Sequence, residues 1–143
     1  MDRKDFIKTC GFSCLGLIGL STFLESCKNS KQITATPKMG KLEIPLSAFK
    51  DGKSGKDLHS VIINNATGAP IVLYKHSDTD IIALLMECTH QGVELAISGN
   101  ILSCSAHGSE FDTRGNVITG PAFQSLKQFP VTIDAGMIYI KLS

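Results

Sequence analysis

Two short segments carry the residues whose types and spacing could do chemistry, Cys88-Thr-His90-Gln-Gly92 and Cys104-Ser-Ala-His107-Gly108-Ser109. Each segment offers one thiolate and one imidazole, so together they supply two sulfur and two nitrogen ligands. Four ligands of these types suit a tetrahedral zinc ion or an iron–sulfur centre. Zinc fingers usually group Cys with Cys and His with His, whereas here each segment carries Cys followed by His.

The pattern C-x-H followed by C-x2-H-G-S resembles the signature of the Rieske [2Fe–2S] family. The resemblance extends to about residue 131 and therefore covers most of the chain after Gly40. It implies a cluster in which Cys88 and Cys104 bind one iron while His90 and His107 bind the other. A structural zinc ion on the same four side chains is the alternative from a different class of protein.

The resemblance also places a set of neighbours around the cluster: Gln91, Gly92, Gly108, Ser109, Phe111, Gly120 and Pro121. Within this set, Ser109 is expected to donate its hydroxyl to a bridging sulfide, and the Gly-Pro segment to cover the cluster from a third side. Rieske proteins of cytochrome bc complexes often have a Tyr at the place of Phe111, with a hydroxyl that donates to a ligand sulfur. They also join the two loops by a disulfide, at places that hold Val93 and Ala106 here.

The ligand charges predict the chemistry of such a cluster. The diferric core carries two positive charges, so two thiolates and two neutral imidazoles leave it neutral, whereas four thiolates would leave a dianion. A neutral site accepts an electron more easily, and Rieske potentials of roughly −150 to +300 mV accordingly exceed the value of about −400 mV for plant-type ferredoxins. We expect one-electron transfer, since no acid, base or nucleophile indicates a substrate site of its own.

Composition limits the remaining possibilities. A chain of 143 residues supports one domain, and its net charge of +1 indicates no nucleic-acid partner. The chain contains no Trp and 13 Gly, which favours strands and turns over long helices. If Cys88 and Cys104 are ligands, the other three Cys all precede residue 28, so the folded domain has no disulfide to form.

The first 27 residues have the pattern of an export signal, in which a basic start precedes an apolar stretch from Cys10 to Leu24. The segment Leu24-Glu-Ser-Cys27 resembles a bacterial lipobox, which predicts that Cys27 is lipidated after cleavage. An uncleaved N-terminal anchor is the alternative. Residues 28–40 are polar and are predicted to form a flexible tether, and residues 41–143 to form the Rieske domain. The expected location is the periplasmic side of a bacterial cell envelope, anchored to the membrane.

The domain is predicted to be all-β, a Rieske-type antiparallel β-sandwich with both cluster-binding loops at one end. Short apolar runs separated by turn residues indicate about nine strands. Among them, 80–87 is a continuous apolar run that ends at Cys88 and is expected to be a buried strand, and 126–133 is expected to be one strand.

The function predicted from these features is one-electron transfer as a subunit of a bacterial respiratory or periplasmic oxidoreductase complex. The expected partners are a redox protein or membrane complex, with quinol and a c-type cytochrome as candidates. The alternatives are a ferredoxin-like carrier that serves an oxygenase and a lipoprotein binding module with a structural zinc site.

Overall fold

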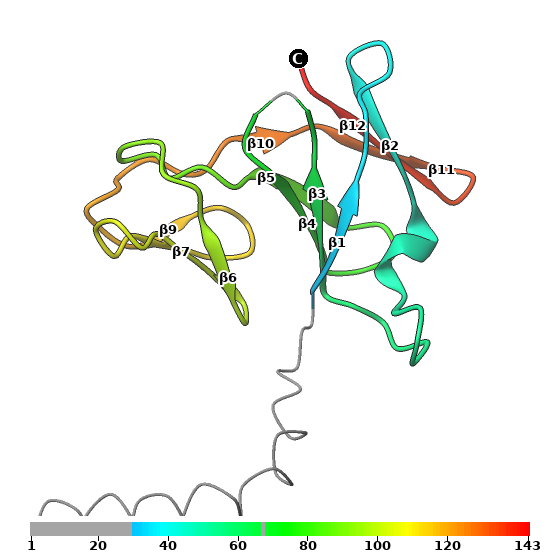
Figure 1. The fold of residues 1–143 in the computed structure, drawn as a ribbon, viewed down its shortest axis with the longest axis horizontal. Coiled ribbons are helices and arrows are strands. Elements are labelled where there is room, and N and C mark those ends of the chain that lie inside the picture. The colour runs from blue at the N-terminus through cyan, green and yellow to red at the C-terminus, as the bar shows by residue number, and fades with distance from the viewer. Residues whose placement is uncertain (1–29, 67) are drawn as a thin grey trace, which may run out of the picture.

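The computed structural model describes residues 30–66 and 68–143, and nearly all of its regular structure is β-strand (Figure 1). One short 3-10 helix, η1 (Leu46–Phe49), follows the second strand. The strands are β1 (Ser30–Thr34), β2 (Lys41–Pro45), β3 (Ser60–Asn64), β4 (Ile71–Lys75), β5 (Ile81–Leu85), β6 (Ala96–Ser98), β7 (Ile101–Ser103), β8 (Glu110–Phe111), β9 (Val117–Thr119), β10 (Gln128–Phe129), β11 (Val131–Asp134) and β12 (Met137–Lys141). Among the described residues, no helix has the length and apolar character needed to cross a membrane.

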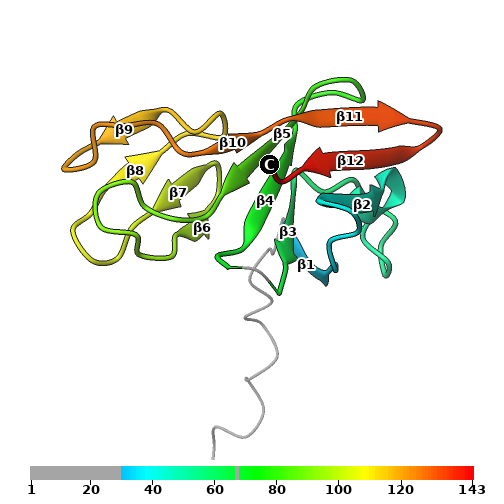
Figure 2. The same cartoon turned by 90° about the horizontal axis from the view of Figure 1, so that it is seen from above.

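These strands form three sheets, which confirms the prediction of an all-β fold. A five-stranded sheet has the order β1-β3-β4-β5-β10, a three-stranded sheet the order β11-β12-β2, and a four-stranded sheet the order β6-β7-β8-β9. Figures 1 and 2 show the four-stranded sheet at one end of the molecule and the three-stranded sheet at the other, with the five-stranded sheet between them.

The central sheet is buried on both faces, which explains why its strands are continuous apolar runs. Successive side chains of a strand point to opposite faces. In β3, Val61 and Ile63 pack toward the three-stranded sheet, whereas Ile62 packs toward the four-stranded sheet. In β5, Ala83 and Leu84 divide in the same way. The expectation of a buried strand leading to Cys88 is therefore correct.

The strand β1 lies within the segment that the sequence predicted to be a flexible tether, and it departs from that prediction. Residues 30–34 pair with β3 in parallel along their whole length, from Ser30 opposite Ser60 to Thr34 opposite Asn64. The strand is held because Ile33 and Ala35 pack against the buried residues of the neighbouring core. The fold is thus not purely antiparallel. The predicted export signal, with Cys27, lies outside the described residues.

The expected single strand over 126–133 is wrong, because the chain changes sheets at Pro130. β10 pairs with β5 in the central sheet, and β11 pairs with β12 in the three-stranded sheet. Proline has no backbone N–H to donate to a ladder, so a strand is easily divided at this residue. The division joins the central sheet to the three-stranded sheet by a direct backbone connection.

Candidate metal centre

The two ligand-bearing loops are the same turn built twice. The carbonyl of Cys88 accepts the N–H of Gly92 at 2.8 Å, and the carbonyl of Cys104 accepts the N–H of Gly108 at 3.0 Å. A second hydrogen bond closes each loop: the N–H of Cys88 donates to the carbonyl of Val93, and the N–H of Cys104 to the carbonyl of Ser109, both at 2.8 Å. Each loop is therefore closed by backbone hydrogen bonds alone, with no disulfide between the two.

The turn requires glycine at its fourth residue after the Cys. Gly92 has φ +73° and Gly108 has φ +80°, which is the left-handed region that an L side chain adopts only at a cost. This accounts for the Gly that follows each His by one or two residues, which the sequence presented only as part of a motif.

The four predicted ligands come together as two pairs. Cys88 and Cys104 are buried side chains with 2% and 3% of their surface exposed. The rings of His90 and His107 meet edge to face, with centroids 4.9 Å apart and planes at 88°. His90 is half-buried and His107 is exposed. The sulfurs therefore lie at the inner side of the site and the imidazoles toward solvent.

The surroundings of Cys104 favour its thiolate. Burial raises the pKa of the thiol, but the backbone N–H groups of Ala106 and His107 and the neighbouring Cys88 thiol lower it by more, and the net shift is downward. Backbone N–H groups directed at a sulfur stabilise negative charge on it, and only a deprotonated thiol binds iron. The second loop is thus electrostatically suited to present a metal ligand.

A Rieske cluster fits the residues that are present. Nδ1 of His90 is buried and has no hydrogen-bond partner among the described residues. A buried imidazole nitrogen is costly to leave unpaired, and coordination to iron would satisfy it. Within residues 30–66 and 68–143, no three His, Cys, Asp or Glu side chains form a group that could hold a single metal ion. The side chains present instead are a pair of sulfurs and a pair of imidazoles.

A third segment, residues 120–124, contacts both loops, and the sequence identified only part of it. After a cis Gly120–Pro121 peptide, the N–H of Ala122 donates to the Oγ of buried Ser109 at 3.0 Å. The hydroxyl of Thr89 donates to the carbonyl of Gln124 at 2.6 Å. Thr89 and Gln124 were missed, because Gln124 acts through its backbone carbonyl, which no residue type reveals, and the Thr89 hydroxyl has its partner 35 residues away.

Phe111 lies beneath the site. It is fully buried, pairs across the sheet with Leu102, and belongs to the same buried group of side chains as Cys88 and Cys104. The aromatic ring is therefore buried in the same group as the two sulfurs, and its expected place beside a ligand sulfur stays a prediction.

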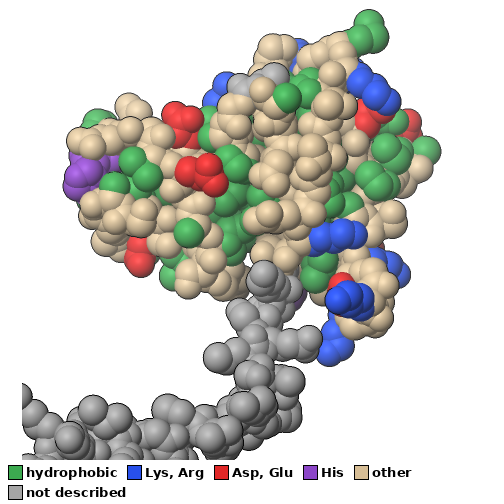
Figure 3. Space-filling view, in the orientation of Figure 1, with side chains coloured by type: hydrophobic (Ala, Val, Ile, Leu, Met, Phe, Trp, Pro, Cys, Tyr) green, Lys and Arg blue, Asp and Glu red, His purple; other side chains and the backbone are tan. Residues whose placement is uncertain are grey.

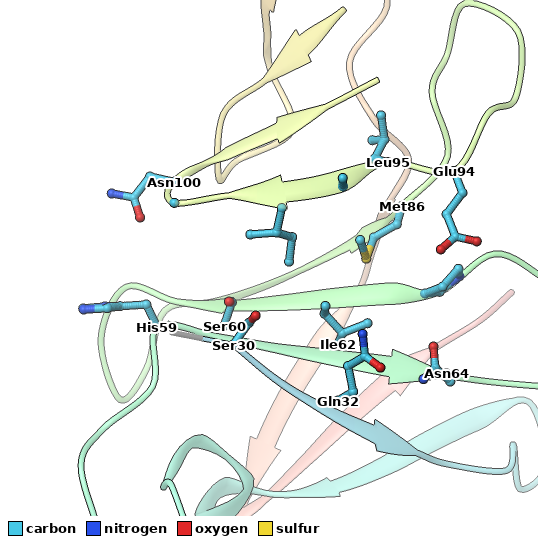
Figure 4. Close-up of a pocket in the computed structure, with 14 residues that line it drawn as sticks. Ser30, Gln32, His59, Ser60, Ile62, Asn64, Met86, Glu94, Leu95 and Asn100 are labelled. Atoms are coloured by element: carbon cyan, nitrogen blue, oxygen red, sulfur yellow. The ribbon is translucent and has the colours of Figure 1, made fainter. Parts of the chain in front are cut away.

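A cavity of about 760 Å³ separates the central sheet from the hairpin of β6 and β7. Figure 4 shows Ile62 and Met86 pointing toward each other across it, with Gln32 and Asn64 at the same space. None of the four predicted ligands lines this cavity, so it is distinct from the metal centre.

Comparison with known proteins identifies the family. Residues 49–130, more than half of the chain, match the Rieske [2Fe-2S] domain. The chain is 34% identical over 84 residues to a cytochrome b6-f complex iron-sulfur subunit of Prochlorococcus marinus (strain MIT 9515), which covers 56% of this chain and 47% of that protein. It is 28% identical over 92 residues to the subunit of the same description from Chlorobaculum tepidum (strain ATCC 49652 / DSM 12025 / NBRC 103806 / TLS), with 57% of this chain and 49% of that protein covered.

Among solved structures, a chain in the complex of reduced oxygenase and oxidized ferredoxin in carbazole 1,9a-dioxygenase has the same fold. The TM-score is 0.54 at 22% identity, and the match covers 73% of this chain and 95% of that one. The chain spans about half the length of the cytochrome b6-f relatives. It belongs to the Rieske [2Fe-2S] domain family, and its cofactor is a Rieske cluster.

Proposed function

We propose that the chain carries single electrons through a Rieske cluster, in which Cys88 and Cys104 would hold one iron and His90 and His107 the other. The observation that carries this assignment is the pairing of sulfur with sulfur and ring with ring, together with the unpartnered Nδ1 of His90. When bound, the cluster supplies a one-electron couple at a potential above that of four-Cys ferredoxins.

The side chains at this site have different roles. Buried Cys88 and Cys104 would hold the cluster from the interior, and their loops are fixed by backbone hydrogen bonds. His107 is exposed, so its imidazole edge is the place where a partner approaches the centre directly. Gly92, Gly108, Ser109 and the segment after Gly120 keep the loops in place, and Gln91 is exposed beside His90.

The ligand assignment is tested on protein produced in cells that assemble iron–sulfur clusters. We expect two irons and two sulfides per chain and, after reduction by dithionite, an EPR signal with the low average g of a Rieske centre. His90→Cys and His107→Cys should change that signal, because each adds a thiolate to the site. His76→Cys, in the exposed turn between β4 and β5, is the matched control and should leave it unchanged. Stoichiometric zinc without iron would refute the assignment and favour the zinc alternative.

We further propose that the protein is exported and anchored on the periplasmic side of a bacterial membrane, as a subunit of a respiratory or periplasmic oxidoreductase complex. The support is the apolar segment before Leu24 and the lipobox-like Leu24-Glu-Ser-Cys27. The relatives, described as subunits of the cytochrome b6-f complex, are consistent with this assignment. Mass spectrometry of the native N-terminus should find lipidated Cys27. An intact Met1 peptide in membrane-bound protein would indicate an uncleaved anchor instead.

A ferredoxin-like carrier for an oxygenase is the second candidate. It is favoured by Val93 and Ala106, which replace the loop cysteines of the quinol-oxidising Rieske proteins. Cell fractionation separates the two proposals, because such a carrier would be found in the cytoplasm rather than with the envelope.

A further inference from the structure

Phe123 is held in solvent beside the predicted ligands. Its side chain is 83% exposed, although the chain on both sides of it is fixed. Ala122 is hydrogen-bonded to the second ligand loop through Ser109, and Gln124 to the first loop through Thr89. An exposed apolar ring on a segment that is hydrogen-bonded to both ligand loops resembles the anchor residue of a docking surface, where aromatic side chains contribute strongly to binding.

The half of the molecule that carries the ligands is acidic. Residues 76–126 contain six acidic residues and one basic residue, Arg114, whereas residues 30–75 and 127–143 contain nine Lys and four acidic residues. Figure 3 shows this on one face: a group of His side chains lies at one end, and most of the Lys and Arg side chains lie over the other half. The half of the molecule that carries the metal centre therefore has a net negative charge, and the opposite half a net positive charge.

The acidic charge nearest the first loop is uncompensated. Asp78 pairs with Lys75 and Asp80 with Arg114, at 2.7 and 2.8 Å. By contrast, Glu87 and Glu94 lie directly opposite each other in an antiparallel bridge, and neither forms a salt bridge with any described residue. Like charges in this arrangement repel each other. The Glu87 carboxylate lies against the first loop, because a Cβ on Gly92 would be 3.5 Å from its Oε1.

We infer that the end of the molecule bearing His107 and Phe123 docks on a redox protein with a positively charged surface around its electron-accepting group. This inference rests on the proposed function. The acidic residues 87, 94 and 110 would steer a basic partner, and Phe123 would be buried in the contact. One electron passes from the reduced centre to the acceptor, which is thereby reduced by one electron, and no bond is made or broken.

The charge distribution decides among the possible occupants of this surface. An anionic lipid surface would be repelled by the acidic half and attracted to the lysines of the opposite half. A second copy of the chain would bring two acidic ends together. An uncharged quinol would not be attracted electrostatically to the acidic half. A basic protein is the partner for which both the charge and the exposed ring are favourable.

The test uses the protein with its cluster. EPR and voltammetry first establish that each variant has the Rieske signal and the reduction potential of the wild type. The probe is a c-type cytochrome with a lysine-rich haem face, and its control is the same cytochrome after succinylation of the lysines. Stopped-flow mixing of reduced protein with ferric cytochrome gives the rate of electron transfer. Surface plasmon resonance with both proteins oxidised gives the Kd without turnover. We expect the unmodified cytochrome to react about tenfold or more faster at low ionic strength, and the difference to shrink at high salt.

Matched variants locate the effect. Glu87→Gln with Glu94→Gln should slow the reaction by about three- to tenfold at low salt, whereas Glu43→Gln with Asp134→Asn removes the same charge in the basic half and should have no effect. Phe123→Ala should weaken binding about tenfold at all salt concentrations. Met39→Ala, which alters an exposed apolar residue outside the acidic half, should leave the Kd unchanged.

Equal rates with native and succinylated cytochrome, or equal effects of the two charge pairs, would overturn the inference. An unchanged Kd for Phe123→Ala would do the same. Preferential electron exchange with quinol in neutral vesicles, insensitive to both charge pairs, would identify quinol as the occupant and also overturn it. A missing Rieske signal in the starting protein would instead refute the proposed function itself.

Discussion

The Oγ of Ser109 accepts a hydrogen bond from the backbone N–H of Ala122 at 3.0 Å, across 13 residues of sequence. Because this hydroxyl oxygen acts as the acceptor toward Ala122, the hydroxyl hydrogen remains free to be donated to another neighbour. Ser109 is completely buried, so that neighbour is not bulk solvent. The geometry supports the expectation that the hydroxyl donates to a sulfide of the cluster.

Ser109→Ala should lower the reduction potential. Hydrogen bonds to cluster sulfur strengthen when an electron is added, and a gain of roughly 1–2 kcal/mol corresponds to about 40–90 mV for a one-electron couple. Protein-film voltammetry measures the shift, and Ser105→Ala, an exposed serine in the same loop, is the matched control. An unchanged potential in Ser109→Ala with an intact cluster would contradict the role of the hydroxyl.

Phe111→Tyr should raise the potential by about the same 40–90 mV. The ring is fully buried in the group of side chains that includes Cys88 and Cys104, and the resemblance implies that a hydroxyl at this place donates to a ligand sulfur. Phe129→Tyr adds a hydroxyl in the other buried group and should leave the potential unchanged. The idea fails if a structure shows the Tyr hydroxyl on a ligand sulfur while the potential stays at its wild-type value.

The sequence predicted the parts of the fold that depend on side-chain type. The run from Ile81 to Leu84 is apolar at every position because both faces of its strand are covered, and this pattern is readable without a structure. The pairing of Cys88 with Cys104 and of His90 with His107 was expected because the two motifs resemble the Rieske signature, and it depends on that resemblance rather than on spacing alone.

The features that the sequence did not predict are contacts made by backbone groups and strands with little apolar pattern of their own. The contact of Thr89 with Gln124 spans 35 residues and ends on a carbonyl, so any residue at that place would serve as acceptor. The strand β1 is polar except for Ile33, so its pattern did not indicate a strand; it is held by pairing with β3 and by the packing of Ile33 and Ala35. Pro130 was included within one expected strand, although its missing N–H allows the chain to leave the central sheet.

Gly108→Ala should destabilise the second ligand loop by about 1–2 kcal/mol, because the residue has φ +80°. No heavy atom lies within 4 Å of the place where its Cβ would stand, so the effect isolates the backbone conformation. Gly52→Ala is the matched control, since Gly52 has equally open surroundings without a left-handed φ. Iron content and the midpoint of thermal unfolding should both fall in Gly108→Ala alone. A variant as stable as the wild type would show that the loop tolerates another conformation.

Tyr74 should make the fold sensitive to alkaline pH. Burial raises the pKa of its phenol from 10.0 to about 12, and the hydroxyl has no partner among the described residues. Above pH 10 the unfolded chain loses this proton while the folded protein retains it. The free energy of unfolding should therefore fall as pH rises from about 10 to 12, by roughly 2–3 kcal/mol in total.

Replacing Tyr74 by Phe should remove this alkaline loss. At neutral pH the change should leave stability unchanged or raise it by about 1 kcal/mol, because an unpaired buried hydroxyl is deleted while the ring remains. Tyr139→Phe, at the half-buried Tyr of β12, leaves Tyr74 in place and should keep the wild-type loss. Denaturant unfolding of the three proteins at pH 8 and pH 11 measures the difference. If Tyr74→Phe loses as much stability between these pH values as the wild type, another group causes the alkaline sensitivity.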